Sequence, residues 1–298
     1  MSVGIPAYNE EKNIKFVLNS VLAQKENDSF KIGEILVVSD GSVDATPDVV
    51  REYRAFDSRI RLYHYDVRRG KCYALNVIFR EGHGDVFVLF DADVILRDEW
   101  VVCGLVEPFL VDKRVGLVGG LPVPLPPEGL IELAGTFSFK LQKFIKENVR
   151  GGCNLYAAHG RVLALSSKLA KSIKVPSTYA DDAYLYLRCI SAGYKFVYVG
   201  EKATVFYRAP RNVKGFVSQS VRFRRALEPL RKIFGELVDR EVKVPMITFL
   251  KAYIKGLIED PRGGFLWTLL YSYATLTIKR TPPFGLYFVD EQSKPLFT

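Results

Sequence analysis

Cysteine is scarce in this chain. Only four of its 298 residues are Cys, and they lie far apart at Cys72, Cys103, Cys153 and Cys189. No two of them form a C-x-x-C pair, so neither a zinc ribbon nor a disulfide framework is indicated, and we expect reduced, partly buried thiols. His159 has no metal-like partner at ligand spacing either, and we predict an ordinary structural role for it.

Long hydrophobic runs are also missing. No run reaches the roughly 20 apolar residues that a helix needs to cross a bilayer. The chain enters a predicted strand almost at once, so we expect no signal peptide and a cytoplasmic location. The glycine pattern G-x-G-x-x-G does not follow the first predicted strand, which counts against a dinucleotide-binding Rossmann domain.

The positive charge of the chain is concentrated in one stretch. The net charge is +9, and residues 208–234 contain eight Lys and Arg against one acid. This surplus suggests an anionic partner: a nucleoside diphosphate, an anionic lipid or nucleic acid. Aromatic residues do not interleave with the basic ones in the way that base stacking requires, so we expect no nucleic acid.

The stretch Val86–Asp93 combines a long apolar run with two carboxylates at its end. Its apolar run predicts a strand buried on both faces, as in a parallel sheet, and the run ends at Asp91 and Asp93. Ligands bind at the carboxyl ends of such strands, and two neighbouring carboxylates suit Mg²⁺ or Mn²⁺ shared with substrate phosphates. The alternative is that one Asp caps the next helix and the other is solvated.

The first part of the chain alternates strands and helices. This order predicts right-handed βαβ crossovers and a mostly parallel sheet, with Tyr8, Asp40, Lys71 and Asp91 along one rim. Asn9 is the expected N-cap of the first helix. The predicted strands are Ser2–Pro6, Glu34–Ser39, Arg61–Tyr65 and the run that ends at Asp91, with helices from about Asn9, Asp44 and Gly70.

The second part is less regular. The proline-rich segment Leu121–Pro127 is predicted to be a connector, neither helix nor central strand. We predict further strands at Val115–Gly119, Val162–Ser166 and Tyr194–Val199, and helices at Leu130–Lys146, from Tyr179 to Gly193, over the amphipathic Phe216–Phe234, and from about Val244. We expect a catalytic domain over residues 1–235 and a helical extension over 236–298.

Six short blocks together resemble the inverting family 2 glycosyltransferases of the GT-A fold. They occur in the family's order over about the first 235 residues: Pro6-Ala7-Tyr8-Asn9-Glu10, Asp40-Gly41-Ser42, Gly70-Lys71 with Ala74-Leu75-Asn76, Asp91-Ala92-Asp93, Asp181-Asp182, and Gln219-Ser220-Val221-Arg222-Phe223. The last block is similar to the Q-x-x-R-W of cellulose- and hyaluronan-synthase relatives, with Phe223 in place of Trp. The transmembrane bundle of the processive members has no counterpart here.

The resemblance implies a metal-dependent, inverting transfer from a UDP- or GDP-sugar. It implies that Asp93 holds the metal, that Asp91 lies nearer the ribose, and that Asp40 binds the base. The base and ribose would be surrounded by Pro6, Ala7, Tyr8 and Glu10. Lys71 would approach the nucleotide as a point charge. The alternatives are ordinary packing for Tyr8, an Asx-turn with Gly41 for Asp40 and a surface position for Lys71.

Asp182 is the predicted general base, because attack by a sugar hydroxyl needs a proton acceptor. Two acids at a helix start can also serve only the helix dipole. Asp181 is predicted to be an acceptor-binding or supporting residue. Gln219 and Arg222 would face the diphosphate and acceptor from one side of a helix, whereas Arg224, Arg225 and Arg231 are predicted to be solvated or membrane-facing.

The expected acceptors are a sugar, a glycolipid or a polyprenyl phosphate; a lipid phosphate is already anionic and needs a base much less. The apolar stretch Phe265–Ile278, followed by Lys279-Arg280, predicts either an interfacial helix on an anionic membrane or a helix packed on the catalytic domain or at a dimer interface. Two rival functions remain open: a sugar-nucleotide nucleotidyltransferase, and a non-catalytic carbohydrate- or membrane-binding module on the same fold.

Overall fold

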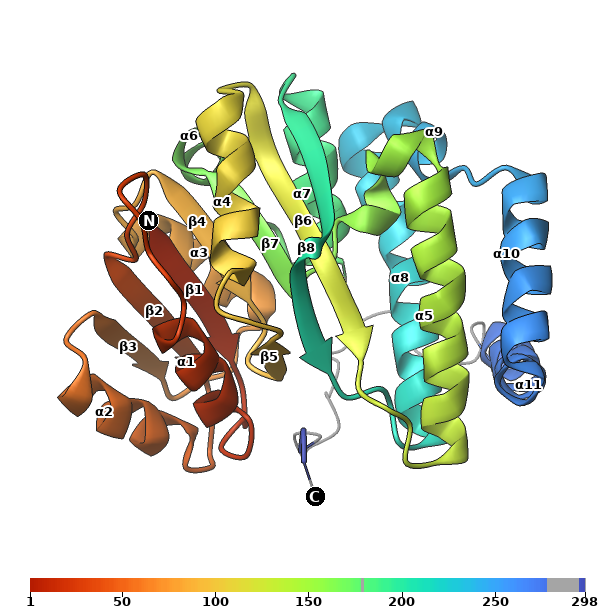
Figure 1. Cartoon of the computed structure of the whole chain (residues 1–298), viewed down its shortest axis with the longest axis horizontal. Coiled ribbons are helices and arrows are strands. Elements are labelled where there is room, and N and C mark those ends of the chain that lie inside the picture. Colours follow the sequence, from red (N-terminus) through yellow and green to blue (C-terminus); the bar gives the residue numbers. More distant parts are fainter. Residues whose placement is uncertain (178–179, 278–294, 298) are drawn as a thin grey trace.

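The computed structural model describes residues 1–177, 180–277 and 295–297, without the side chain of Phe223; Tyr179, Ile278 and Lys279-Arg280 lie outside these residues. Within them the strands form one eight-stranded sheet in the order β3-β2-β1-β4-β7-β6-β8-β5 (Figure 1). The strands are β1 (Ser2–Ala7), β2 (Glu34–Asp40), β3 (Ile60–Tyr65), β4 (Val86–Phe90), β5 (Val94–Leu96), β6 (Val115–Pro124), β7 (Val162–Ser166) and β8 (Lys195–Tyr207).

Helices cover both faces of the sheet, as the alternating pattern predicts (Figure 1). One face packs against α1, α2 and α4, and the other against α3, α6, α7 and α8. The helices are α1 (Ile14–Leu22), α2 (Thr46–Phe56), α3 (Lys71–Glu81), α4 (Val101–Val111), α5 (Leu130–Asn148), α6 (Ser167–Ser172), α7 (Asp181–Ser191), α8 (Val213–Phe234), α9 (Glu236–Val242), α10 (Met246–Glu259) and α11 (Pro261–Thr277), with short 3₁₀ turns η1 (Arg150–Gly152) and η2 (Leu155–Ala157).

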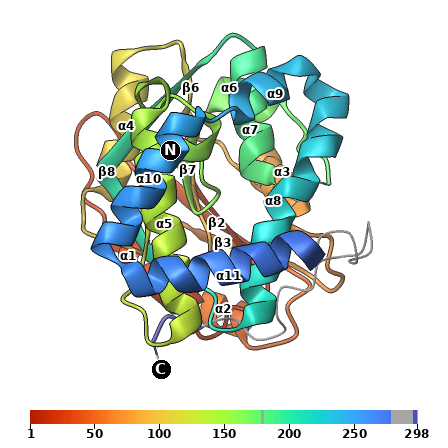
Figure 2. The ribbon, with the colours of Figure 1, turned by 90° about the vertical axis from the view of Figure 1, so that its right-hand side faces the viewer.

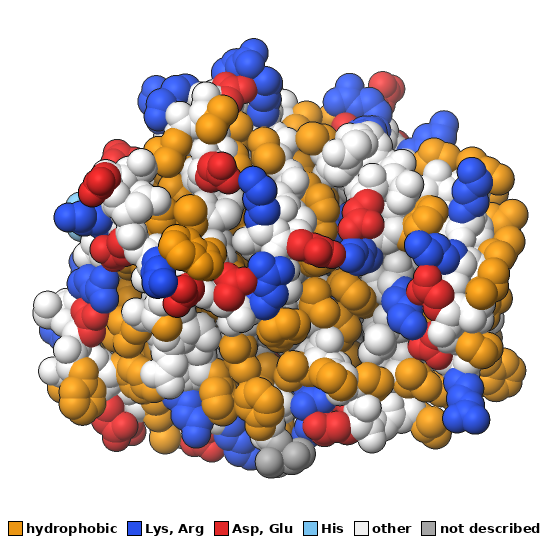
Figure 3. All heavy atoms as spheres, in the orientation of Figure 1, with side chains coloured by type: hydrophobic (Ala, Val, Ile, Leu, Met, Phe, Trp, Pro, Cys, Tyr) orange, Lys and Arg blue, Asp and Glu red, His pale blue; other side chains and the backbone are white. Residues whose placement is uncertain are grey.

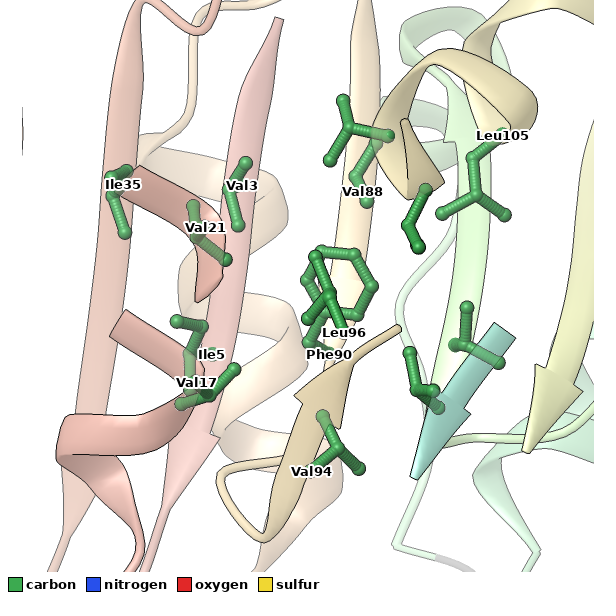
Figure 4. Packing of buried hydrophobic residues seen from close by; sticks show 14 of the residues in the cluster. Val3, Ile5, Val17, Val21, Ile35, Val88, Phe90, Val94, Leu96 and Leu105 are labelled. Carbon is green, nitrogen blue, oxygen red and sulfur yellow. The ribbon is translucent and has the colours of Figure 1, made fainter. Parts of the chain in front are cut away.

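β4 is buried on both faces, which confirms the prediction from its unbroken apolar run. Val88 and Phe90 point into the core that α1 and α4 cover (Figure 4), while Phe87 and Leu89 point into the core beneath α3. All four side chains are at most 3% exposed. A strand packed in this way is held in register on both sides, so the residues that follow it have a fixed position.

The sheet is parallel over its first strands and mixed beyond β4. β1 pairs in parallel with β2 and with β4, and β2 pairs in parallel with β3. β7 is antiparallel to both of its neighbours, β4 and β6. β6 and β8 are parallel again, and β5 joins the end of β8 in antiparallel orientation. The sequence did not predict β5 or α4.

The prediction that Leu121–Pro127 is a connector is wrong for its first half, because β6 continues to Pro124 and pairs with β8. β7 contacts β6 only as far as Gly119, so beyond that residue β6 has β8 as its one described partner. Alternate N–H groups of a strand point to opposite sides. Leu125 N–H donates to Tyr207 O of β8, so the nitrogens of Pro122 and Pro124 are on the unpaired side, where an edge strand tolerates proline.

The prediction that Asn9 caps the first helix is also wrong, because α1 begins five residues later, at Ile14. Asn9 instead has a φ of 52°, a left-handed conformation that Asn tolerates. Its side-chain oxygen accepts a hydrogen bond from Val43 N, and its own N–H donates to Ser42 Oγ. Asn9 thus joins the loop after β1 to the loop after β2.

The C-terminal helices form a third layer outside α5. Phe137 and Leu141 of α5 pack with Ala252 of α10 and Trp267 of α11, and Figure 2 shows α10 and α11 in front of α5. No helix in the described ranges is long and apolar enough to cross a membrane. Of the two alternatives for this region, packing on the rest of the chain is observed; contact with a membrane and the domain boundary at residue 235 stay predictions.

Candidate functional site

One cleft of about 320 Å³ lies at the rim where β1, β2 and β4 end. It is lined by all twelve residues that the sequence singles out: Pro6, Ala7, Tyr8, Glu10, Asp40, Lys71, Asp91, Asp93, Asp181, Asp182, Gln219 and Arg222. These residues come from segments more than 200 positions apart. The carboxyl ends of parallel strands meet at one edge of a sheet, which accounts for the first eight. The start of α7 and the N-terminal half of α8 supply the rest.

Asp91 and Asp93 lie in the turn that joins β4 to β5. Ala92 between them is buried in the core, and the pairing of β5 with β8 anchors the far side of the turn. Burial raises the pKa of Asp91; the charge on Lys71 opposes this rise, and that on Asp93 adds to it. Burial, followed by the charge on Asp93, also raises the pKa of Glu10 well above its usual value. The three carboxylates thus form a crowded anionic corner.

Lys71, the first residue of α3, lies between carboxylates from two elements. Its Nζ is 2.6 Å from Asp91 Oδ1 and 3.1 Å from Asp181 Oδ2, and it donates to Gly160 O at 3.3 Å. Burial lowers the pKa of Lys71, but Asp181 and Asp91 outweigh it, so that pKa is raised. Lys71 therefore stays charged, and it ties the end of β4 to the start of α7 as well as facing the cleft.

Asp182 is held at the start of α7. Its Oδ2 accepts from Gly160 N at 3.2 Å, and its Oδ1 accepts from Ala183 N at 2.8 Å. Burial, followed by the neighbouring charge on Asp181, raises the pKa of Asp182. A carboxylate with a raised pKa is a stronger proton acceptor than an ordinary Asp, which suits a general base.

Asp40 has backbone partners from another loop. Its carboxylate accepts hydrogen bonds from the N–H groups of Arg69, at 2.9 Å, and Gly70, at 2.5 Å. Burial raises its pKa, although these two bonds oppose the rise. The guanidinium of Arg68 lies 3.8 Å above the ring of Tyr8, so a cation covers that face of the ring. Arg68 lines the same cleft, and the sequence did not single it out.

The turn before β7 supplies two more residues that the sequence missed, His159 and Arg161. Arg161 is stacked 3.9 Å from the centre of the Tyr207 ring, and its Nε is buried without a hydrogen-bond partner among the described residues. Burial and, next, the charge on Arg161 hold the pKa of His159 well below its usual value, so this ring is neutral at pH 7. His159 is thus in the wall of the cleft.

The first turns of α8 close the cleft. Asn212 caps this helix by accepting a hydrogen bond from Gly215 N, and Lys214, Gln219 and Arg222 line the cleft. In the described part of the chain neither Lys214 nor Arg222 forms a salt bridge. Lys214 is in the first turn of α8, where the helix dipole also favours an anion, and Arg222 adds a second positive charge about two turns further along. This part of α8 is therefore a favourable place for a diphosphate.

The predicted solvated or membrane-facing position of Arg224 is wrong. Its guanidinium lies 4.4 Å from the centre of the Tyr271 ring, and its Nη1 donates to Thr275 Oγ1 at 3.0 Å. The reason is that α11 packs across α8, which the amphipathic pattern of α8 alone does not indicate. Arg231 is exposed and pairs with Asp239.

A divalent cation fits the anionic corner. Within the described ranges no group of three or more His, Cys, Asp or Glu side chains is arranged to hold a metal by itself. Mg²⁺ and Mn²⁺ need no such cage, because they use one or two carboxylates and take other ligands from water and substrate phosphates. Asp93 forms no salt bridge with any described residue, whereas Asp91 is engaged by Lys71. Asp93 is the residue best placed to hold the ion.

Part of this chain matches a protein family and curated relatives in sequence. The family model described as glycosyl transferase family 2 matches residues 2–171. Glycosyltransferase AglD of Haloferax volcanii is 38% identical over 98 residues, which are 32% of this chain and 15% of that relative. Dolichyl-phosphate beta-glucosyltransferase ALG5A of Trichomonas vaginalis is 34% identical over 97 residues, 31% of this chain and 30% of that relative. The matched stretches thus span less than a third of these curated relatives.

The similarity to a solved structure covers nearly the whole chain. The mannosyltransferase PcManGT from Pyrobaculum calidifontis, in complex with GDP-Man and Mn²⁺, superposes with a TM-score of 0.61 and 20% sequence identity. The superposition covers 93% of this chain and 80% of that one. At this identity the likeness establishes the GT-A architecture, as the motif order predicts.

Proposed function

Because the chain belongs to glycosyltransferase family 2, we propose that it transfers a sugar from a nucleoside-diphosphate sugar to an acceptor oxygen, with inversion at the anomeric carbon. The observation that carries this proposal is the gathering of all twelve predicted residues in one cleft. Carboxylates and basic side chains both line that cleft, and some of them are paired, as Lys71 is with Asp91 and Asp181. This distribution suits a ligand that combines a diphosphate with a bound cation and a neutral sugar.

The donor would lie along the rim of the sheet. Asp40, Tyr8 and the loop that carries Arg68 would hold the base and ribose, and the N-terminal half of α8 would face the diphosphate. Asp93 would hold Mg²⁺ or Mn²⁺ against the phosphates; when bound, such an ion neutralises the negative charge that develops on the leaving diphosphate. The mannosyltransferase complex with GDP-Man and Mn²⁺ on the same fold supports this arrangement.

The transfer is a single displacement. An acceptor oxygen forms a bond to the anomeric carbon from the side opposite the diphosphate, and the bond from that carbon to the diphosphate oxygen breaks. The nucleoside diphosphate leaves with the bonding electron pair. For a hydroxyl acceptor, the proton passes to Asp182, whose raised pKa favours its uptake. Lys71 keeps Asp91 and Asp181 in place, and no covalent enzyme intermediate forms.

Release of nucleoside diphosphate tests this proposal. UDP-glucose and GDP-mannose are incubated with the protein and Mn²⁺, with and without candidate acceptors. We expect release of UDP or GDP that needs the metal and increases with an acceptor. Pyrophosphate release from a nucleoside triphosphate and a sugar phosphate would instead identify a nucleotidyltransferase. Binding of neither donor would leave only a non-catalytic module.

A further inference from the structure

A second cavity of about 460 Å³ adjoins the first. The two share four wall residues, His159, Asp182, Gln219 and Arg222, so they meet at the predicted general base. The second cavity lies between α5, α8 and the C-terminal helices α10 and α11. None of α5, α10 and α11 contributes to the first cleft. The second cavity is therefore on the acceptor side of Asp182, away from the nucleotide residues.

Away from the shared end, the walls are mainly apolar and aromatic. α11 contributes Trp267 and Tyr271, whose rings are stacked with centroids 4.6 Å apart, and α10 contributes Phe249. The other aromatic residues of the wall are Phe139, Tyr156, Tyr207 and Phe216. The cavity thus has a polar end at the reaction centre and an apolar remainder, the distribution of an amphipathic ligand rather than of a free sugar.

The cation in this wall has no carboxylate partner. Arg224 lies over Tyr271 and forms no salt bridge with a described residue. Its side chain forms part of the cavity wall. Together with Arg222 at the shared end, Arg224 favours an anionic head group such as a phosphate.

The helices that wall the cavity also carry an exposed apolar face. Ile247, Leu250, Ile254 and Ile258 recur at helical spacing along α10 and are 59%, 47%, 49% and 79% exposed. Figure 3 shows hydrophobic side chains gathered with Lys and Arg along the right-hand side of the molecule, over α10 and α11. An apolar helix face with basic residues suits the surface of an anionic bilayer. The same helix, α10, thus contributes Phe249 to the cavity wall and these apolar side chains to the surface.

We propose that the second cavity binds a lipid-linked acceptor, with its phosphate-bearing head between Arg222 and Arg224 and the first part of its chain among the aromatic residues of α10 and α11. This rests on the proposed function and names the acceptor class. If the lipid phosphate itself attacks, its oxygen bonds to the anomeric carbon, the donor diphosphate leaves, and no proton is removed. If the lipid carries a sugar, a hydroxyl of that sugar faces Asp182.

The test compares acceptors that differ only in chain length. A long polyprenyl phosphate in phosphatidylcholine vesicles, a short prenyl phosphate and inorganic phosphate are each offered with Mn²⁺ and radiolabelled UDP-glucose or GDP-mannose. A second series uses the same two lipids linked to glucose, and the series that takes up label identifies the nucleophile. We expect a KM for the long chain at least about tenfold below that for the short one, because the cavity buries several methylenes.

Two variants locate this preference. Gln142→Trp adds a ring at an exposed position in the wall of the cavity without removing core packing, and Asn148→Trp adds the same ring elsewhere on α5 as its control. Gln142→Trp should remove the chain-length preference, and Asn148→Trp should keep it. Arg224→Gln should raise the KM for both lipids. Equal use of long and short chains by the wild type, or a preference that survives Gln142→Trp, would overturn the proposal. A failure of the proposed function is distinguishable, because stabilisation by nucleoside diphosphate and Mn²⁺ would then be absent as well.

Discussion

Lys71 Nζ lies 2.6 Å from Asp91 Oδ1, which links the start of α3 to the end of β4 at the centre of the cleft. Replacing Lys71 by Met leaves two neighbouring carboxylates without their shared cation. We expect a loss of about 1–3 kcal/mol in the free energy of unfolding at pH 7, near the low end because the carboxylates are partly solvated. Urea unfolding measures it, with exposed Lys168→Met as the control, expected to cost less than about 0.5 kcal/mol.

The pH dependence of this loss has a defined sign. Without Lys71 the pKa of Asp91, already raised by burial, rises further. A folded-state pKa above the unfolded value means that stability falls as pH rises from the unfolded pKa to the folded one. The difference between Lys71→Met and wild type should therefore be small near pH 4 and reach its full size at neutral pH. A difference that is constant across this range would contradict the ion-pair interpretation.

Asp182→Asn tests the base. With a hydroxyl acceptor, we expect kcat to fall by about 10²–10⁴-fold, since the amide cannot take the proton, while nucleoside diphosphate still stabilises the protein. With an acceptor that attacks through a phosphate oxygen, the loss should stay below about tenfold. Full activity of the variant toward a hydroxyl acceptor would remove Asp182 from the mechanism.

The charge on Asp181 should raise the pKa of Asp182. Burial and the charge on Asp181 raise the pKa of Asp182, so the base is lost as pH falls through a value above the ordinary Asp pKa of about 3.9. Asp181→Asn removes the like charge and should move the acid limb of kcat/KM toward lower pH. The pH profile of hydroxyl-acceptor transfer checks this. A limb that does not move, or that moves to higher pH, would contradict the assignment.

Gly41 holds the loop after β2 close to Arg68. It has a φ of 74°, and a Cβ at this position would overlap the backbone nitrogen of Arg68. Gly193 has a similar φ of 79° with open space around it. Gly193→Ala should lower the free energy of unfolding by about 1–2 kcal/mol, because only the left-handed backbone is unfavourable for Ala there. Gly41→Ala should lower it further and should also weaken nucleotide binding. Thermal unfolding and nucleotide titration of both variants compare the two; equal effects would contradict the packing argument.

The sequence predicted the rim of the cleft because that rim depends on local patterns. Apolar runs that end in Asp40 or Asp91 identify parallel strands and their polar ends at once. The direction of β7 was not predictable in this way, since a five-residue run buried on both faces looks the same in either orientation. Because β7 is antiparallel to β4, the residues before it, His159 and Arg161, reach the same rim. That is why both were missed.

The acceptor side was less predictable because it depends on contacts between distant segments. The helical character of α8 and α11 follows from composition, but the contact between Arg224 and Tyr271 does not. Proline disfavours central strands, so the sequence of Leu121–Pro127 predicts a connector. Only the register of β6 with β7 and β8 shows that this part of β6 has a side without a partner.

The proposed reaction depends on a divalent cation held by Asp93 together with the phosphates of a bound nucleotide. The most direct measurement is thermal unfolding of the wild type and Asp93→Asn with UDP or GDP, each with and without Mn²⁺. At a ligand concentration 100 times its Kd, stabilisation should reach about 2.7 kcal/mol. We expect this shift for the wild type only when nucleotide and Mn²⁺ are both present, and we expect its loss in Asp93→Asn. Equal stabilisation of the two proteins, or none by either nucleotide, would contradict it.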